Sequence, residues 1–322
     1  MADLMVNFIG LKLKNPLIAG SSTMTKSLDG LLKLQDAGVS AVVLKSLFEE
    51  ELAQDINVAD DFHPEAYEYF INDAATLYGS TKYIDFVKAA KKNLFIPVIA
   101  SINCLGGKWW VDFAKDIEAA GADALELNIA YIPFDISEDP REIENRYCTI
   151  IEAIKKSIKI PVLVKIGYYF TSVPLMIKRF KDAGADGVTM FNKFFRMAID
   201  VENMCFKGLE LYSCQEETYQ VLRYVAVCSS QVDIDICANT GIHNANLALQ
   251  HIMAGASAFQ IVSAIYKNGY EIVGTILNGI NSYLDRKGFA SINDIKGKAA
   301  NFDGGFKTFE RIQYMKYAGD KY

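Results

Sequence analysis

The sequence predicts a (β/α)8 barrel, in which eight parallel strands form an inner ring and the helices between them form an outer ring. The first observation is a junction that recurs four times, at 36–46, 119–128, 182–192 and 253–262. In each copy an Ala-Gly pair closes an amphipathic run, and a short apolar segment follows. Glycine at that position is typical of a helix that ends in a left-handed cap. Each copy therefore indicates a helix that leads into a strand.

The second observation is a set of four further apolar segments, at 15–22, 96–103, 160–166 and 234–241. Segments that are apolar almost throughout are typical of parallel strands buried on both faces. Two of them begin with Ile-Pro, and proline fits the first residue of a strand because no ladder donor is needed there. Helical patterns such as 83–93 and 111–121 lie between the strands.

A doubly wound open sheet is the alternative fold. It is less favoured, because no G-x-G-x-x-G motif opens a helix after the first strand. Residues 1–322 are expected to form one domain, since barrels of this length are common. Two connections, 47–82 and 193–219, are long enough to form excursions over the mouth of the barrel, and 298–322 extend beyond the eighth helix.

Composition narrows the class of protein. The net charge of −6 and the absence of a basic run argue against a nucleic-acid partner. No run of about 18 apolar residues predicts a membrane helix, and the N-terminus lacks a signal-peptide pattern, so a cytoplasmic protein is expected. Six cysteines without C-x-x-C spacing and only three histidines argue against a metal site. His243 could contact a phosphate, although a solvent-facing capping position is favoured, and His251 is expected at the surface or at an interface.

Lys45 and Lys165 each end an apolar strand, so each ammonium is expected at the mouth of the barrel. Burying a lone ammonium is costly unless an anion meets it. One explanation is a salt bridge to a carboxylate on a neighbouring strand, and Glu126 is the only plausible local partner. Because strand-end carboxylates are scarce, an anionic ligand is the favoured explanation.

The ends of the seventh and eighth strands predict a phosphate site. Small residues there let backbone N–H groups approach an oxyanion, and Thr240 and Ser263 add hydroxyl groups. Tight turns without a ligand are the alternative explanation. A phosphate on one side and lysines and amides on the other suit a phosphorylated planar cofactor such as FMN.

The motifs NPLIAGSS, VLKS, ALELN, PVLVKI, MFN, ANTGI, GASAFQIVSAIYKNG and KGFASINDIKGK occur in this order. Together they resemble the class 1 dihydroorotate dehydrogenases over most of residues 5–298. VTMFNKFF and FERIQYMK also resemble a branch described as dihydroorotate-dehydrogenase-like. The resemblance implies an FMN-binding barrel that oxidises dihydroorotate to orotate.

The resemblance also implies roles for individual residues. The lysine that lies near N1 and O2 of the flavin corresponds to Lys165, which would stabilise the reduced anionic flavin. The asparagines that bind substrate correspond to Asn128 and Asn192 and, in a looser alignment, to Asn72. The positions expected to contact FMN are Gly20, Ser21, Lys45, Ser46, Asn103, Asn128, Lys165, Thr240, Gly241, Val262 and Ser263. The paired glycines that the family carries between strands 6 and 7 are not evident.

The loop after the fourth strand departs from the family. There the family has Asn-x-Ser-Cys-Pro-Asn, in which the cysteine removes the proton from C5 of dihydroorotate. This chain has Asn128-Ile-Ala-Tyr-Ile-Pro133, so the cysteine is replaced by Tyr131. Tyr131 could act as the base only if a nearby cation lowered its pKa, and aromatic packing is the commoner role. Asp135 and Tyr147 are other candidates for the base.

Three functions are consistent with this sequence. The favoured one is an FMN-dependent oxidoreductase acting on dihydroorotate or a related cyclic amide or acid, with Tyr131, Lys165 and Lys45 as catalytic candidates. The second is a non-redox lyase or isomerase that binds a phosphorylated metabolite through Lys45 or Lys165. The third is a flavin-holding subunit without turnover. No membrane partner is expected. The resemblance implies a homodimer and allows a separate electron-transfer partner.

Overall fold

Eight parallel strands form a closed ring in the computed structural model, which describes residues 2–48, 80–103, 110–129, 131–133, 135–208 and 211–300. Ring closure comes from the pairing of β4 with β6, where Val42 lies opposite Val98. This pairing excludes the open sheet and confirms the predicted barrel. In order around the ring the strands are β3 (Leu17–Ala19), β4 (Ala41–Val43), β6 (Val98–Asn103), β7 (Ala124–Asn128), β8 (Val162–Ile166), β9 (Gly187–Met190), β12 (Asp235–Ala238) and β13 (Ala258–Ile261).

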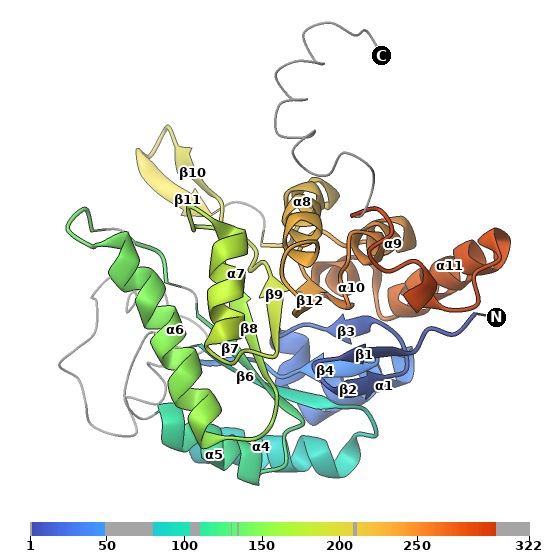
Figure 1. Cartoon of the computed structure of the whole chain (residues 1–322), viewed down its shortest axis with the longest axis horizontal. Coiled ribbons are helices and arrows are strands. Elements are labelled where there is room, and N and C mark those ends of the chain that lie inside the picture. Colours follow the sequence, from blue (N-terminus) through green and yellow to red (C-terminus); the bar gives the residue numbers. More distant parts are fainter. Residues whose placement is uncertain are drawn as a thin grey trace, which may run out of the picture.

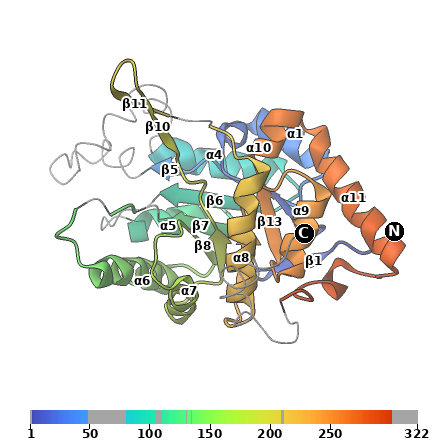
Figure 2. The same cartoon turned by 90° about the horizontal axis from the view of Figure 1, so that it is seen from above.

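Helices surround the ring of strands when the molecule is seen from above (Figure 2). Each buries one face, as in α6, where Tyr147, Ile150, Ile151 and Ile154 lie inward at the spacing of a helical stripe. The polar face of each helix remains in water. These helices are α1 (Leu28–Ala37), α4 (Ser80–Asn93), α5 (Trp110–Ala119), α6 (Pro140–Ser157), α7 (Val173–Asp182), α8 (Thr218–Ser229), α9 (Ala245–Met253) and α11 (Glu271–Lys287).

The four repeated Ala-Gly junctions are confirmed as helix ends. Gly38, Gly121, Gly184 and Gly255 have φ of 106°, 92°, 102° and 110°, all in the left-handed region. A side chain is strained in that region, so glycine allows the chain to turn from the helix into the next strand. The cap of α1 is typical, because the N–H of Gly38 donates to the carbonyl oxygen of Gln35 at 3.0 Å.

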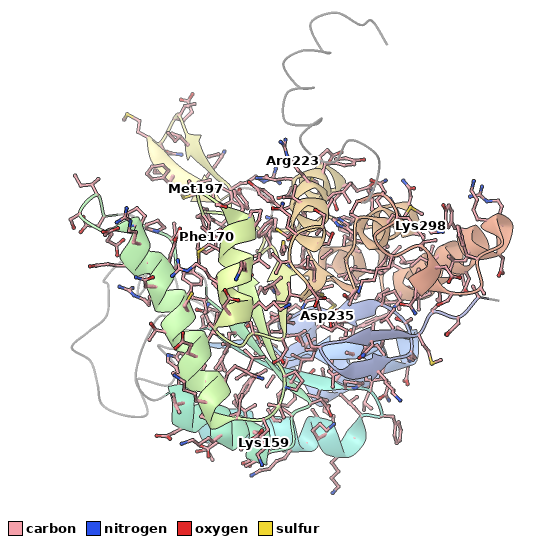
Figure 3. All side chains as sticks on the ribbon, in the orientation of Figure 1. Lys159, Phe170, Met197, Arg223, Asp235 and Lys298 are labelled. Atoms are coloured by element: carbon pink, nitrogen blue, oxygen red, sulfur yellow. The ribbon has the colours of Figure 1, made fainter. Side chains whose placement is uncertain are left out.

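The amino-terminal end of the barrel is closed by a hairpin of β1 (Val6–Phe8) and β2 (Leu11–Leu13). The N–H of Ile9, in its turn, donates to Asp235 at the start of β12 at 2.6 Å. A Cβ atom on Gly187 would lie 2.6 Å from the Ile9 side chain, so the turn of the hairpin can pack here only because this residue is glycine. Asp235 is labelled in Figure 3, where it lies beside the amino-terminal strands.

The opposite end carries the excursions. Within 193–219 the chain forms an antiparallel hairpin of β10 (Met197–Asp200) and β11 (Cys205–Gly208), which projects from the ring (Figure 1). After β4 the short β5 (Leu47–Phe48) pairs with β6, and the following residues 49–79 lie outside the described part, as do 301–322. Among the described helices, none has the length and apolar character needed to cross a bilayer.

Candidate active site at the carboxyl ends of the strands

A cavity of about 420 Å³ opens at the carboxyl ends of the barrel strands. It is lined by segments that follow β3, β4, β8, β9, β12 and β13, which are far apart in sequence and meet only because the ring closes. A barrel places the ends of all its strands at one face, so this is where polar strand-end residues converge. The predicted residues that line the cavity are Ser21, Lys45, Lys165, Asn192, Thr240, Gly241, Val262 and Ser263.

The described wall of the cavity carries positive charge only. Lys45, Lys165 and Lys193 line it, and no aspartate or glutamate is among the described residues that do so. Lys45 also lies 4.6 Å from the centre of the Phe48 ring, an arrangement that favours a cation. An anionic ligand therefore suits this wall.

Lys165 nevertheless has a protein carboxylate beside it, as the salt-bridge explanation required. Its Nζ lies 3.7 Å from Oε1 of Glu126, which is fully buried inside the barrel. The alternative explanation, a salt bridge to Glu126, is therefore observed for Lys165, and an anionic ligand in the cavity stays a prediction. Lys165 contacts Glu126 within the barrel and lines the cavity as well.

Hydroxyl groups connect the cavity wall to this buried carboxylate. Ser21 and Ser46 lie with their Oγ atoms 3.1 Å apart, and Ser46 and Ser101 with theirs 2.8 Å apart. Ser101 Oγ then donates to Glu126 at 3.4 Å. Ser46 therefore contacts Ser21, which lines the cavity, but Ser46 itself does not line it.

The predicted asparagines lie together. Asn192 Nδ2 donates to Asn128 Oδ1, across the ends of β9 and β7. Asn103 lies opposite Asn128 on the neighbouring strand, and Asn128 lies opposite Lys165 on the other side. Asn72 is in the segment 49–79, outside the described residues.

The turn after β12 has the tight geometry that the sequence predicts. Gly241 has φ of 82°, and a Cβ atom there would lie 2.5 Å from the backbone nitrogen of Thr218. Thr240 also has a positive φ, 78°, which is unusual for a β-branched residue and marks a strained site. Its Oγ1 donates to the carbonyl oxygen of Phe191 at 2.9 Å, which helps to hold that conformation.

Gly20, at the end of β3, lies close to the end of β13. Its N–H donates to the carbonyl oxygen of Ile261 at 3.2 Å, and a Cβ atom on Gly20 would lie 2.9 Å from a methyl group of Val262. The end of β3 and the end of β13 can therefore pack together only with glycine at this position. This packing brings Ser21 beside Val262 and Ser263, the last of which begins α10 (Ser263–Asn268).

Residues that the sequence analysis did not assign complete the wall. Ser213 receives a hydrogen bond from Gly241 at its Oγ, and its N–H donates to Ser263. The rings of Tyr212 and Tyr266 stack with centroids 5.1 Å apart at the rim. Ser213 lies in the long connection after β9, which carries no local motif, so only the folded chain identifies it.

Both described histidines are buried, so the expectation of a surface position is wrong. His243 lies with Nε2 3.2 Å from Ser213 Oγ, and burial, with a smaller contribution from the nearby cation of Lys267, lowers its pKa. His251 Nε2 lies 2.8 Å from Thr218 Oγ1, and burial lowers its pKa to about 3. Among the described residues, no group of three potential metal ligands forms.

Tyr131 does not have the environment that a base requires. Its hydroxyl donates to Glu138, and Arg146 lies 5.0 Å from the centre of its ring. Burial and then Glu138 raise the pKa of Tyr131, and the lowering effect of Arg146 is smaller. The condition set for this residue, a pKa lowered by a cation, is therefore not met. The alternatives have no better environment, since burial raises the pKa of Tyr147 to about 12 and Asp135 is exposed.

A second, smaller cavity of about 130 Å³ adjoins the first. Asn192 and Thr240 line both cavities. The walls of the smaller cavity also include three aromatic rings and a salt-bridged arginine; these residues are Tyr168, Phe191, Phe194 and Arg196.

Comparison with known proteins places this geometry in a family. The sequence model of the family described as dihydroorotate dehydrogenase matches residues 3–284. Similar curated proteins carry the name dihydroorotate dehydrogenase B (NAD(+)), catalytic subunit. The protein of this name from Pyrococcus abyssi is 31% identical over 305 residues, which cover 91% of this chain and 98% of that protein. The one from Thermoplasma acidophilum is 27% identical over 312 residues, which cover 93% and 99%. With its closed barrel and its polar residues gathered at the strand ends, the chain belongs to the dihydroorotate dehydrogenase family of oxidoreductases.

Proposed function

We propose that the protein is an FMN-dependent oxidoreductase that oxidises dihydroorotate or a related cyclic amide or acid. The observation that carries this proposal is the main cavity, whose described lining has three lysines and no carboxylate. Glycine-dependent turns form part of the wall of the same cavity, and Asn192, whose amide donates to Asn128, lines it as well. This distribution suits a ligand with a phosphate at one end and a hydrogen-bonding ring system at the other.

The residues present fit FMN. Pockets for ligands of this size are usually about 300–1,000 Å³, and the cavity has about 420 Å³. The tight turn at Thr240 and Gly241 and the hydroxyl of Ser263 would hold the phosphate, because turns of this kind form concave sites for anions. Gly20, Ser21, Lys45 and Lys165 would hold the ring system.

The chain's own contribution would be charge and orientation. The FMN, when bound, would supply the acceptor for the hydride. Lys165 would stabilise negative charge on the ring edge that faces it, because a fixed cation in a water-poor site stabilises developing charge strongly. Asn128 and Asn192, which contact each other, would orient the amide and carboxylate groups of the substrate.

Tyr131 is not proposed as the base that removes the substrate proton. The favoured candidate from the sequence, Tyr131, has a raised pKa and lies outside the described lining of the main cavity. We propose that Tyr131 instead supports the loop after β7, through its hydrogen bond to Glu138 and its contact with Arg146.

The test is an absorption spectrum of the purified protein, followed by anaerobic titration with dihydroorotate. We expect the two absorption bands of bound flavin and their bleaching by the substrate. If the protein contains flavin but dihydroorotate does not bleach it, the result would support FMN as the cofactor and exclude dihydroorotate as the substrate. A colourless protein that takes up no FMN would contradict the proposal. Trapping of a carbonyl substrate by borohydride at Lys45 or Lys165 would then support a lyase.

Electron transfer beyond the flavin is a separate part of the proposal. The curated relatives are named as catalytic subunits of NAD(+)-linked enzymes. By analogy we propose a cytoplasmic homodimer that passes electrons to a separate partner. Gel filtration with light scattering, and NAD(+) reduction with and without a candidate partner subunit, test these two points.

A further inference from the structure

The barrel contains a fully buried carboxylate, that of Glu126 on β7, with partners on four other strands. Oε1 receives a hydrogen bond from Ser101 at 3.4 Å and lies 3.7 Å from the Lys165 ammonium. Oε2 receives hydrogen bonds from Thr189 at 3.3 Å and from Gln260 at 2.8 Å. Each oxygen therefore has two partners. A buried carboxylate is tolerated only with this degree of compensation.

The two members of the ion pair differ in their surroundings. Glu126 is held by three uncharged donors from β6, β9 and β13, so its position does not depend on Lys165 alone. Lys165 is also buried, with 7% of its surface exposed, but it lines the cavity. The carboxylate is the fixed member, and the ammonium is the member that can face a ligand.

Other titratable groups of the described chain that lie at this site include Cys237, Lys45 and Lys193. Cys237 on β12 is near enough to interact, but burial raises the pKa of its thiol well above the usual value, so it stays neutral. The strand neighbours of Lys165 in register are the uncharged Asn128 and Thr189. Lys45 and Lys193 line the same cavity and carry the same sign of charge.

We infer that Glu126 is a positioning residue that keeps the Lys165 side chain charged and facing the cavity. The inference rests on the proposed function, since the charge of Lys165 matters only if a ligand such as FMN receives it. Without the carboxylate, the buried ammonium would lose its proton or turn toward water. In either case the positive charge beside the ligand would fall.

The direction in which Glu126→Gln changes the reduction potential of the bound FMN distinguishes this positioning role from simple neutralisation of charge. If Glu126 only neutralised Lys165, Glu126→Gln would expose a stronger cation and raise the reduction potential of the bound FMN. The positioning role predicts the opposite, a fall that approaches the potential of Lys165→Met. In the double variant Glu126→Gln/Lys165→Met, the potential should be no lower than in Lys165→Met alone. Measured as a difference from wild type at each pH, the deficit in potential of Glu126→Gln should become smaller as the pH is lowered.

A matched control is available on the surface. Glu152 and Lys156 in α6 form a pair at 3.6 Å, almost the same distance, but both side chains are exposed. Glu152→Gln should leave the potential and its pH dependence unchanged. A rise in the potential of Glu126→Gln, or no change in it, would overturn the inference.

Stability supplies a second measurement that requires no flavin. Lys165→Met should leave Glu126 as an unpaired buried carboxylate, which destabilises the fold at neutral pH. Protonation would relieve this cost, because an unpaired buried carboxyl group binds its proton more tightly in the folded state than in the unfolded state. Relative to wild type, the variant should therefore gain stability as the pH falls from 7 toward 5.

The double variant keeps the inference testable even if one of the single variants fails to fold. Glu126→Gln/Lys165→Met should be more stable to urea than either single variant, because neither charge is left alone. If Lys165→Met matches wild type in stability at every pH, the two residues are not coupled and the inference fails. Absence of FMN from the wild-type protein would remove the proposed function but would leave this coupling measurable.

Discussion

The two sides of the candidate site are built differently. On the side formed by the turns after β3, β12 and β13, backbone geometry dominates, with Gly20 and Gly241 at positions where a Cβ atom would collide. On the side formed by the loop after β7, side chains dominate, through Asn128, Tyr131 and Glu138. Backbone constraints tolerate few substitutions, whereas side-chain contacts can be exchanged one at a time. Substitutions should therefore be costlier on the first side than on the second.

The largest expected effect comes from the backbone-controlled side. Gly241→Ala would force a side chain into a positive φ and to within 2.5 Å of the Thr218 nitrogen. We expect the free energy of unfolding to fall by about 3 kcal/mol and bound FMN to be lost, as measured by urea unfolding and flavin content.

The matched control is Gly274→Ala in α11, where a Cβ atom would meet nothing within 4 Å. Alanine is the better helix former, so this variant should be unchanged or up to about 1 kcal/mol more stable. A Gly241→Ala protein with wild-type stability and flavin content would show that the turn is less constrained than its geometry indicates.

The same side should be sensitive to acid through His251, which contacts Thr218 beneath the Gly241 turn. Burial lowers the pKa of His251 in the folded protein to about 3, below the ordinary value of 6.5. The unfolded chain therefore takes up the proton first, so stability is complete above about pH 6.5 and falls as the pH drops toward 3.

The fall should approach about 1.4 kcal/mol per pH unit in that window. His251→Gln should have a flatter curve, as measured by urea unfolding between pH 4 and 8. Parallel curves for the two proteins would mean that His251 is not the group responsible.

A smaller effect is expected where the two sides meet. Asn192→Ala removes the amide that donates to Asn128 and that lines both cavities. We expect KM for dihydroorotate to rise about tenfold, equivalent to about 1.4 kcal/mol, with little change in flavin content. Asn203→Ala, in the exposed turn of the β10–β11 hairpin, is the control and should keep the wild-type KM.

The smallest effect is expected at Tyr131. Because its pKa is raised and its hydroxyl donates to Glu138, Tyr131→Phe should keep kcat within about threefold of wild type. Loss of a general base normally costs about 10²–10⁴-fold. A loss of that size in Tyr131→Phe would show that Tyr131 is the base. It would also show that the loop after β7 tolerates substitution no better than the turns after β3, β12 and β13.

Much of the fold could be predicted because its signals are local. Gly38, Gly121, Gly184 and Gly255 each follow an alanine at the end of a helix, and all four have the expected left-handed backbone. The apolar strand segments match the eight strands of the ring for a similar reason, since burial on both faces leaves a continuous apolar run. Lys45 and Lys165 line the cavity as expected, because each directly follows such a run.

Other features of the site depend on contacts between distant segments. The pairing of Lys165 with Glu126 requires β7 and β8 to be neighbours in a particular register, and a one-residue shift would turn one of them away. The burial of His243 beside Ser213 depends on where the long connection after β9 settles. No local pattern encodes such contacts.

The sequence alone determined the barrel, its helix ends and the residues that gather at its mouth, because these follow from periodicity and from the conformational freedom of glycine. Only the tertiary structure decided that Lys165 has a fixed carboxylate behind it and that Tyr131 contacts Glu138 rather than acting as a base with a lowered pKa. The reason is physical. Charge and pKa depend on which groups a side chain meets after folding, and those groups come from strands and loops that are distant in the sequence.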